Sequence, residues 1–376
     1  MMNICLVVSS LTCGGAERVV ATHAAKFQNL GYQVSIVTIS SKDTDFYSIP
    51  DSVRRVGLDK LSNSKGIIGA VTSNYSRILA IRRAAKRVSA DVIVSHLTET
   101  NVLALLAGVG LRTPVIITEH CDPLNLDYGR LWTMLRRITY PRCHMLVSVS
   151  KGVDSYFTWL SQSQRRTIYN PFFNPHADKD SRADSITSEW LNNLSGNERV
   201  IVSMGRFTYQ KGFDLLLKSF AGVSGGYPDW RLIILGDGEL RGELEQLVED
   251  LDLKDRVDLP GRVSDPFIVL KRADLFVMAS RFEGFPMAHG EAMLCGLPVI
   301  ATDCPSGPDE LIRNEVDGVL VSNGDQDALE NAMARLMSDT LLRRKMSQSA
   351  LQVSDRFNAE EIVGDWVELF SNAVKP

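Results

Sequence analysis

Short aliphatic runs alternate with helical segments along this 376-residue chain. Each run is apolar on both faces, which is typical of parallel strands that lie between layers of helix. In the first half the predicted strands are Ile4–Val8, Val34–Ile39, Val92–Ser95, Val115–Thr118, Leu146–Val149 and Thr167–Tyr169. The helices between them include Ala16–Leu30 and Tyr75–Ser89. This alternation predicts a doubly wound α/β domain.

The alternation stops after residue 173 and restarts near residue 200. We interpret the polar stretch 174–197 as a linker that leads into a second domain. The strands predicted there are Val200–Met204, Leu232–Leu235, Val257–Leu259, Leu275–Ala279 and Val299–Thr302, and the helices include Gly212–Phe220, Leu240–Leu251 and Met287–Cys295. We therefore expect two Rossmann-like domains that face each other across a cleft. The first is residues 1–173, completed by an amphipathic helix at 358–376, and the second is residues 174–357.

Composition excludes several classes of protein. The net charge of −4 gives no global attraction to nucleic acid. The six cysteines are scattered without a Cys-x-x-Cys pair, which indicates reduced cytosolic thiols rather than disulfides or a zinc site. No apolar run reaches the roughly 18 residues of a membrane span, and no signal peptide is evident. We expect a cytoplasmic protein that can lie at a membrane surface.

Two carboxylates, Glu283 and Glu291, bracket a Gly-Phe-Pro turn and the start of a predicted helix. Proline suits the first position of a helix, and the helix N-terminus offers N–H groups to a phosphate. Glu291 inside the helix can accept hydrogen bonds from ribose hydroxyls, and Glu283 in the loop can reach a sugar. The pattern suits a sugar-nucleotide site. A loop carboxylate and a solvated helix carboxylate are the structural alternative.

Two other loops follow predicted strands. Gly14 and Gly15 open a helix and allow a phosphate or sugar to approach backbone N–H groups, although the pattern is neither Gly-x-Gly-x-x-Gly nor a Walker loop. Arg206 follows the first strand of the second domain, and Lys211 precedes the next helix. Both cations lie at the carboxyl edge of the sheet, where they could neutralise a departing UDP without a metal. A tight turn and two surface cations are the alternatives.

His120 ends the strand at 114–119, where a neutral imidazole can hydrogen-bond a sugar hydroxyl. Asp43 and Asp45 match an Asp-x-Asp pattern of some metal-dependent sugar transferases, but Lys42 beside them opposes a cation, so we predict no metal site. The histidines interpreted as structural, because they lack such placement or a partner, are His23, His96, His144, His176 and His289. His289 is the least certain of these, because it lies between the two glutamates.

Residues 77–87 form a basic, amphipathic predicted helix. Its cations are Arg77, Arg82, Arg83, Lys86 and Arg87. The segment 131–137 adds two arginines and a tryptophan. Such surfaces bind anionic lipid, and the same cations could bind the diphosphate of a lipid-linked substrate. A solvated helix face is the alternative.

Taken together, these residues resemble glycosyltransferase family 4, whose members are retaining enzymes with the two-Rossmann GT-B fold. The motifs that carry the resemblance are Gly14-Gly15, Thr118-Glu119-His120, Gly205-Arg206, Lys211-Gly212, Gly236-Asp237-Gly238, Gly261-Arg262-Val263, Glu283 with Glu291-Ala292-Met293, and Gly296–Thr302. The Gly-Gly-Ala-Glu-Arg loop, Asn170-Pro171 and Cys304–Pro308 are similar to a bacterial branch that extends polysaccharides or lipid-linked oligosaccharides. That branch includes enzymes that add α-linked N-acetylgalactosamine to undecaprenyl-diphosphate glycans.

The resemblance implies a role for each matched residue. Arg206 and Lys211 would hold the donor diphosphate, and Glu291 would hold the ribose. The backbone of Val263 would meet the uracil. The implied contacts with the donor sugar come from His120, Glu283, Gly284, Phe285 and Pro286, of which His120 and Glu283 are the predicted catalytic residues. The basic helix at 77–87 is similar to one that binds a lipid diphosphate. Residues 288–290 depart from the family, whose members usually carry aliphatic side chains there.

The expected activity is therefore transfer of a hexose or N-acetylhexosamine from a UDP-sugar, with retention at the anomeric carbon and without a metal or other cofactor. The expected partners are the UDP-sugar, a polyprenyl-diphosphate-linked glycan and the inner face of the cytoplasmic membrane. N-acetylgalactosamine is favoured, but galactose, glucose and N-acetylglucosamine stay open as donors. A sugar-nucleotide epimerase of similar two-domain build and a non-catalytic binding module are the alternatives.

Overall fold

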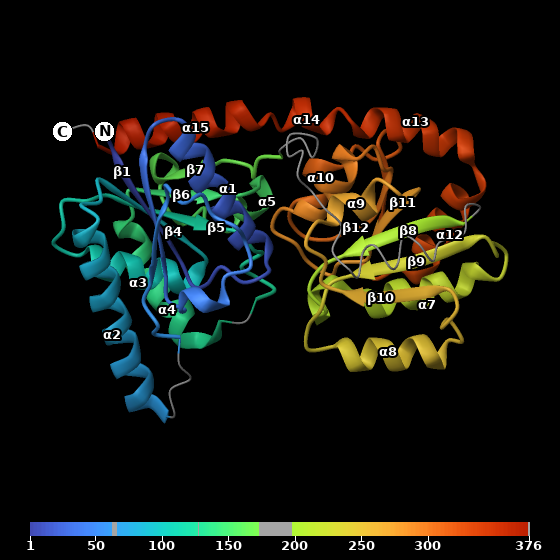
Figure 1. The fold of residues 1–376 in the computed structure, drawn as a ribbon, viewed down its shortest axis with the longest axis horizontal. Coiled ribbons are helices and arrows are strands. Elements are labelled where there is room, and N and C mark those ends of the chain that lie inside the picture. The colour runs from blue at the N-terminus through green and yellow to red at the C-terminus, as the bar shows by residue number, and fades with distance from the viewer. Residues whose placement is uncertain (62–65, 127, 173–197, 375–376) are drawn as a thin grey trace. The chain divides into compact units, whose positions relative to one another are not determined.

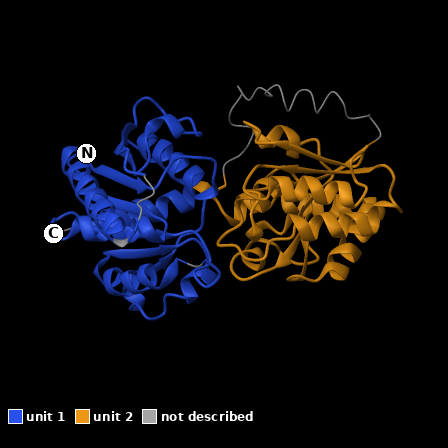
Figure 2. Cartoon of the chain, turned by 90° about the horizontal axis from the view of Figure 1, so that it is seen from below, with its two compact units in different colours: residues 1–171, 360–376 blue, residues 172–359 orange. Residues whose placement is uncertain are grey.

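The computed structural model describes residues 1–61, 66–126, 128–172 and 198–374. The chain divides into an N-terminal unit, residues 1–171 with 360–376, and a C-terminal unit, residues 172–359 (Figure 2). The linker predicted at 174–197 lies outside the described residues.

The N-terminal unit contains a seven-stranded sheet in the order β3-β2-β1-β4-β5-β6-β7, and all its strand pairs are parallel (Figure 1). Its strands are β1 (Asn3–Val8), β2 (Gln33–Thr38), β3 (Arg54–Gly57), β4 (Val92–His96), β5 (Val115–Glu119), β6 (Met145–Ser148) and β7 (Arg165–Thr167). Its α-helices are α1 (Gly15–Asn29), α2 (Gly66–Arg87), α3 (Thr98–Gly108), α4 (Gly129–Thr139), α5 (Lys151–Ser155) and α15 (Ala359–Ala373). The central strands β4 and β5 are buried at every residue, which explains why their sequences are apolar on both faces.

The last helix, α15, returns to this unit and packs on α1. Phe370 lies edge-on to Phe27, with ring centroids 5.1 Å apart, and Trp366 contacts the ring of His23 at 5.4 Å. These four side chains are buried. The amphipathic pattern at 358–373 therefore reflects burial against α1.

The C-terminal unit contains a six-stranded parallel sheet in the order β10-β9-β8-β11-β12-β13. Its strands are β8 (Arg199–Met204), β9 (Trp230–Leu235), β10 (Val257–Gly261), β11 (Leu275–Met278), β12 (Val299–Asp303) and β13 (Gly318–Ser322). Its α-helices are α7 (Phe213–Ser224), α8 (Arg241–Asp250), α9 (Pro266–Leu270), α10 (Met287–Leu294), α11 (Pro308–Leu311), α12 (Gln326–Ser338), α13 (Thr340–Ala350) and α14 (Val353–Arg356). The two predicted doubly wound domains are confirmed.

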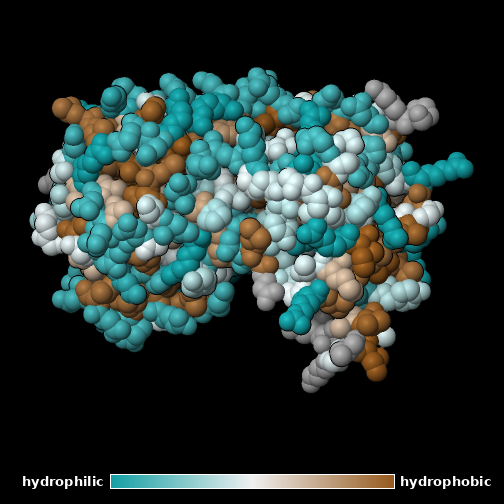
Figure 3. All heavy atoms as spheres, turned by 180° about the vertical axis from the view of Figure 1, so that it is seen from behind, coloured by the Kyte–Doolittle hydropathy of each residue, from teal (hydrophilic) through white to brown (hydrophobic). Residues whose placement is uncertain are grey.

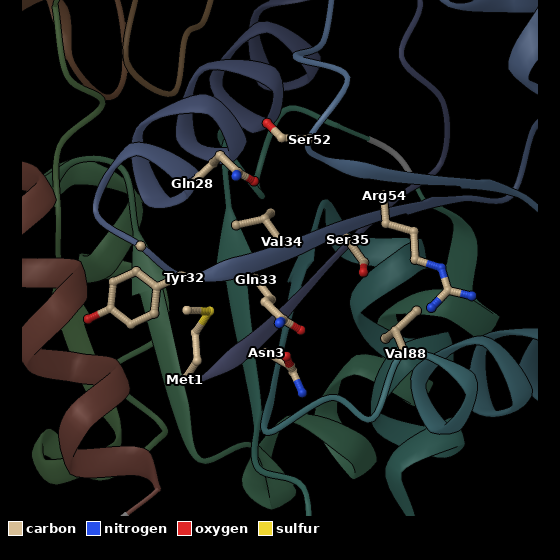
Figure 4. Close-up of a pocket in the computed structure, with 11 residues that line it drawn as sticks. Met1, Asn3, Gln28, Tyr32, Gln33, Val34, Ser35, Ser52, Arg54 and Val88 are labelled. Atoms are coloured by element: carbon tan, nitrogen blue, oxygen red, sulfur yellow. The ribbon is translucent and has the colours of Figure 1, made fainter.

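In both sheets the order in which successive strands are added reverses beside the first strand. In the C-terminal unit the chain proceeds from β8 to β9 on one side and then crosses to β11 on the other. The N-terminal unit does the same around β1. Loops that leave the carboxyl ends of strands at such a switch point diverge and leave room for a ligand. A cavity of about 440 Å³ lies elsewhere, beside Asn3 and Gln33 at the starts of β1 and β2 (Figure 4).

Several elements differ from the predictions. Helix α2 begins at Gly66, nine residues before the predicted start at Tyr75, and β7 ends at Thr167, where the predicted strand began. Neither β3 nor β13 was predicted. In the part of the chain that the structure describes, no helix combines the length and hydrophobicity needed to cross a membrane. Figure 3 shows exposed hydrophobic side chains as patches between hydrophilic ones.

Candidate active site

A buried ion pair lies at the switch point of the C-terminal sheet. Lys211 Nζ donates to Glu283 Oε1 at 2.6 Å, and Ser280 Oγ donates to the same oxygen at 2.7 Å. The Glu283 side chain is only 6% exposed. Lys211 follows β8 and Glu283 follows β11, so the neighbouring positions of these strands bring together two residues that are 72 positions apart.

Two glycines shape the backbone around Lys211. Gly212 has a φ of +62°, and a Cβ there would lie 1.9 Å from the carbonyl oxygen of Ala279, just after β11. A side chain is therefore excluded by both conformation and space. Gly205 lies under the Lys211 side chain, where a Cβ would be 3.2 Å from Lys211 Cε. The close approach of this turn to the end of β11 directs the ammonium group toward Glu283.

The charge of Glu283 is stabilised although the side chain is buried. Burial raises the pKa of this carboxyl, but the Lys211 ammonium and the hydrogen bonds from Lys211 and Ser280 hold the pKa below its ordinary value of 4.5. His289 lies close enough to interact electrostatically with both Glu283 and Lys211, and burial lowers its pKa to about 4. The site therefore combines an ammonium, a carboxylate and a neutral imidazole at neutral pH.

Helix α10 begins directly after this loop. The helix starts at Met287 as predicted, and Pro286 is its N-cap rather than its first residue. Phe285 is buried, with its ring 5.7 Å from Phe172 and 5.3 Å from Phe357. Glu291 lies one turn into the helix and is buried. The aromatic cluster anchors the backbone that presents Glu283.

The N-terminal unit gathers a second set of polar groups at the ends of β4 and β5. His96 ends β4, and its Nδ1 lies 3.0 Å from Nε2 of His120, which follows β5. Thr118 Oγ1 lies 2.8 Å from the same nitrogen of His96 and 3.1 Å from that of His120. Burial lowers the pKa of His120 to about 4, so its imidazole is neutral at neutral pH.

The residue before His120 is a buried carboxylate that ties β5 to two helices. Glu119 accepts hydrogen bonds from Thr98 at 2.9 Å and Asn101 at 3.3 Å, both on α3, and from the hydroxyl of Tyr140 just after α4. Burial raises the pKa of Glu119, and these donors oppose the shift. The network holds the point at which the chain leaves β5 for His120.

Comparisons with known proteins identify what these two sheets belong to. Residues 13–172 match the family described as Glycosyltransferase Family 4, and residues 185–353 match Glycosyl transferases group 1. The first domain therefore belongs to glycosyltransferase family 4, and the chain is a glycosyltransferase. It is 28% identical over 372 residues, 99% of both chains, to a Campylobacter jejuni α-1,4-N-acetyl-D-galactosaminyltransferase named for a substrate linked to undecaprenol by a diphosphate.

Solved structures show that this glycosyltransferase has the GT-B fold. Sucrose-phosphate synthase from Thermosynechococcus elongatus superposes with a TM-score of 0.84 at 20% identity and 99% coverage of both chains. HepE from Anabaena, solved in complex with UDP-glucose, gives a TM-score of 0.81 at 21% identity, with 99% of this chain and 100% of that chain covered.

The structure brings some predicted residues of the glycosyltransferase together and leaves others apart. Half-buried Lys211 contacts Glu283, which with the Gly284–Pro286 turn is buried. Arg206 is exposed in the loop after β8, and Val263 is half-buried in the loop after β10. Gly14 caps α1, where a Cβ would lie 2.3 Å from the carboxylate of Glu17, while Gly15 has open space around it.

The predicted lipid-diphosphate cations divide into two groups. Arg83, Lys86 and Arg87 are exposed on α2. Arg82 instead donates to the carbonyl oxygens of Ala107 and Val109 at 2.8 and 2.6 Å, and so terminates α3. Arg77 donates to Lys60 O and to Asn74, at 3.0 and 2.9 Å.

His96 corrects the prediction that it lacks a partner, because it contacts both His120 and Thr118. The signal was available, since His96 ends β4 and His120 directly follows β5, and these are adjacent strands. Ser280 was not predicted at all, and nothing in its immediate sequence distinguishes it. Asp45 of the Asp-x-Asp match accepts two hydrogen bonds from Arg55, both at 2.7 Å.

Proposed function

We propose that this glycosyltransferase moves a hexose or N-acetylhexosamine, with N-acetylgalactosamine favoured, from a UDP-sugar to a lipid-linked oligosaccharide or polysaccharide precursor. Transfer proceeds with retention at the anomeric carbon and without a metal or other cofactor. The observation that carries the proposal is the buried contact between Lys211 and Glu283. It supplies fixed positive charge and a sugar-binding carboxylate at the sheet edge where α/β folds bind phosphorylated ligands. The Campylobacter jejuni relative supports the choice of acceptor and of N-acetylgalactosamine.

The proposed reaction is a front-face displacement. The bond between the anomeric carbon and the diphosphate oxygen breaks, and the acceptor hydroxyl oxygen bonds to the same face of that carbon. The departing diphosphate oxygen takes the hydroxyl proton. Lys211 and Arg206 stabilise the negative charge that develops on the diphosphate. Glu291 holds the ribose, the Val263 backbone meets the uracil, and Glu283 and His120 contact the transferred sugar.

A donor and acceptor screen tests this proposal. Purified protein is incubated with each UDP-sugar, with and without a polyprenyl-diphosphate oligosaccharide, and UDP release and the new glycosidic linkage are followed by NMR. We expect acceptor-dependent UDP release with an α-linked product, unchanged in excess EDTA. Conversion of the UDP-sugar without an acceptor would instead indicate an epimerase. Binding without turnover would indicate a non-catalytic module.

We also propose that the protein is cytoplasmic and lies at the inner face of the membrane that carries its acceptor. Leu131, Met134 and Ile138 are 59%, 52% and 54% exposed, and their spacing places them on one face of α4. Exposed Arg130 lies at the start of this helix. The exposed cations of α2 would hold the lipid diphosphate. Anionic lipid attracts cations by roughly 1 kcal/mol each, and buried apolar side chains add to this.

Vesicle sedimentation tests the membrane contact. The wild-type protein should sediment with vesicles that contain phosphatidylglycerol, and a variant with Leu131, Met134 and Ile138 replaced by Ser should sediment far less. Leu341→Ser is the control, because this leucine is even more exposed, at 77%, but belongs to the C-terminal unit. Equal sedimentation of all three proteins would contradict the proposed surface.

A further inference from the structure

Three polar atoms meet where His96 contacts His120 and Thr118, and few arrangements of their hydrogen atoms are possible. His96 Nδ1, His120 Nε2 and Thr118 Oγ1 lie 2.8 to 3.1 Å from one another. The hydroxyl of Thr118 donates outward, to the carbonyl oxygen of Ser95 at 2.9 Å. Among these three atoms Thr118 Oγ1 is therefore an acceptor. The imidazoles supply the N–H groups for the hydrogen bonds that join the three atoms.

The two imidazoles share one proton along their contact. Burial lowers the pKa of His120 to about 4, and burial together with His120 and His23 lowers the pKa of His96 well below 6.5, so both rings are neutral at neutral pH. A neutral ring carries one N–H and one lone pair. Two lone pairs or two N–H groups would repel each other at 3.0 Å. One of the facing nitrogens is therefore protonated and the other is not.

This coupling leaves two arrangements. In the first, His96 Nδ1–H donates to His120 and Thr118, so His120 carries its proton on the outer nitrogen, Nδ1. In the second, His120 Nε2–H donates, so its Nδ1 is a bare acceptor and His96 carries its proton on Nε2. The first arrangement makes His120 a hydrogen-bond donor at Nδ1, and the second makes it an acceptor.

The burial of His96 distinguishes between them. His96 is 0% exposed, and among the described residues its Nε2 has no hydrogen-bond partner. In the described chain each arrangement leaves one N–H without a partner, on His120 Nδ1 in the first and on His96 Nε2 in the second. The second encloses that unpaired donor in the core, which is rare in proteins. The first places it on His120, which is only partly buried, so that a ligand oxygen could satisfy it.

The backbone supports a fixed position for His96. Leu97, the next residue, has a φ of +73°, which is unfavourable for a leucine. Such strain persists where the surrounding structure determines the conformation, and it is concentrated at functional sites. Asn101 N donates to Leu97 O at 2.8 Å at the start of α3.

We propose that His96 is a positioning residue that, with Thr118, holds His120 in the Nδ1–H tautomer, so that His120 donates a hydrogen bond to a substrate oxygen instead of acting as a base. The link to substrate rests on the proposed function, whereas the tautomer itself does not. In the transferase, the acceptor of this hydrogen bond is an oxygen of the transferred sugar.

Nitrogen NMR of the protein labelled with ¹⁵N-histidine reads the tautomer directly. The chain has six histidines, and His120→Gln and His96→Asn assign the two signals of interest. We expect His120 to show a protonated Nδ1 and an unprotonated Nε2 at neutral pH. The opposite pattern overturns the proposal. The spectrum needs no substrate, so it stands even if no sugar transfer is found.

Matched variants test whether His96 is the cause. His96→Asn can place an amide N–H where Nδ1 lies, and should keep the tautomer of His120. His96→Leu removes the donor, so His120 Nε2–H should turn to Thr118 and Nδ1 should lose its proton. His96→Phe is a second non-donor of similar shape, should the leucine variant not fold. An unchanged His120 in a folded non-donor variant overturns the proposal.

The same variants separate this role from a structural one. Loss of one hydrogen bond to substrate should lower kcat/KM about ten-fold in the non-donor variants, with rates near wild type in His96→Asn. Equal loss in both, with the tautomer unchanged, assigns His96 to packing alone. Absence of transfer in the wild-type protein refutes the proposed function and leaves the tautomer result intact.

Discussion

Replacing Lys211 by Met removes one charge and leaves the shape of the site nearly unchanged. The methionine keeps the apolar part of the side chain, which packs beside Gly205. Glu283 is then a carboxylate whose side chain is 6% exposed and which, among the described side chains, still accepts a hydrogen bond from Ser280. Breaking a buried pair in this way costs about 3 to 5 kcal/mol. We expect calorimetry at pH 7 to show a loss of that size in the unfolding transition of the C-terminal unit.

The loss should depend on pH with a definite sign. In the wild-type protein the pKa of Glu283 lies below 4.5, so its stabilising contribution is present above pH 4.5 and is lost on acidification through the folded-state pKa. Without Lys211, burial dominates and raises the pKa, so the carboxyl becomes destabilising at pH 7 and harmless once protonated. The gap between the two proteins should therefore narrow from pH 7 toward pH 4.5.

Glu283→Gln in the Lys211→Met background separates stability from activity. The double variant has no unpaired buried charge and should recover about 2 kcal/mol relative to Lys211→Met, within the usual range of pairwise coupling. Transfer should stay at least about 100-fold to 1,000-fold below wild type, because the cation at the leaving group is still missing and the carboxylate that contacts the sugar is now missing too. Lys218→Met, on the exposed face of α7, is the control and should change stability by no more than about 0.5 kcal/mol. A Lys211→Met loss below about 1 kcal/mol that does not vary with pH would refute the reasoning.

Three other substitutions test the packing and titration of the fold. Gly290→Ala places a Cβ 2.0 Å from the ring of Phe172 and should cost about 1 to 2 kcal/mol in thermal unfolding, with partial recovery in the Phe172→Leu background; a stabilised variant would contradict this contact. The folded-state pKa of His120 is about 4 and the unfolded value is about 6.5, so unfolding takes up a proton there, and His120 alone lowers stability by about 2 kcal/mol between pH 7 and pH 5. His120→Gln should flatten that decline in urea titrations, and an unaltered slope would count against a buried neutral ring. Asp317 is 0% exposed and pairs with Arg313 at 2.6 Å and with Arg356 at 3.3 Å. Asp317→Asn should therefore lower the free energy of unfolding in urea by about 3 kcal/mol. A change within about 0.5 kcal/mol would argue against these ion pairs.

The elements that could be predicted are those whose burial gives them an apolar composition. Parallel strands between helix layers are apolar on both faces, and those runs were located to within one or two residues, apart from β13, which was missed although it is apolar. Strand β3 lies at the edge of its sheet and begins with Arg54-Arg55, so it has no continuous apolar run. The first turns of α2 were missed because Ile68 and Val71 are exposed, which removes the amphipathic pattern, and because glycine and β-branched residues there favour helix weakly.

The sequence predicted which residue types form the site and at which edge of the sheet they lie, but it did not predict which of them touch. That Lys211 and Glu283 both follow strands could be read from their surroundings, whereas their 2.6 Å contact depends on β8 and β11 being neighbours. His96 was missed for the same reason. Its partner follows the adjacent strand, so the contact could be inferred only by comparing the ends of the two strands and not from His96 alone.

The two sheets share one strand order around their first strand, yet they carry different chemistry at the carboxyl edge. In the C-terminal unit the polar groups meet at the switch point itself, between β8 and β11, and consist of a pair that stays charged against burial because each charge neutralises the other. In the N-terminal unit they meet one strand away, between β4 and β5, and consist of neutral imidazoles that burial keeps uncharged. Topology fixes where a polar group can be presented, and the side chains at those positions decide which charge is presented there. Positive charge suits a phosphate and neutral hydrogen-bonding groups suit a sugar hydroxyl, so the proposed function assigns Lys211 to the diphosphate and His120 to the sugar.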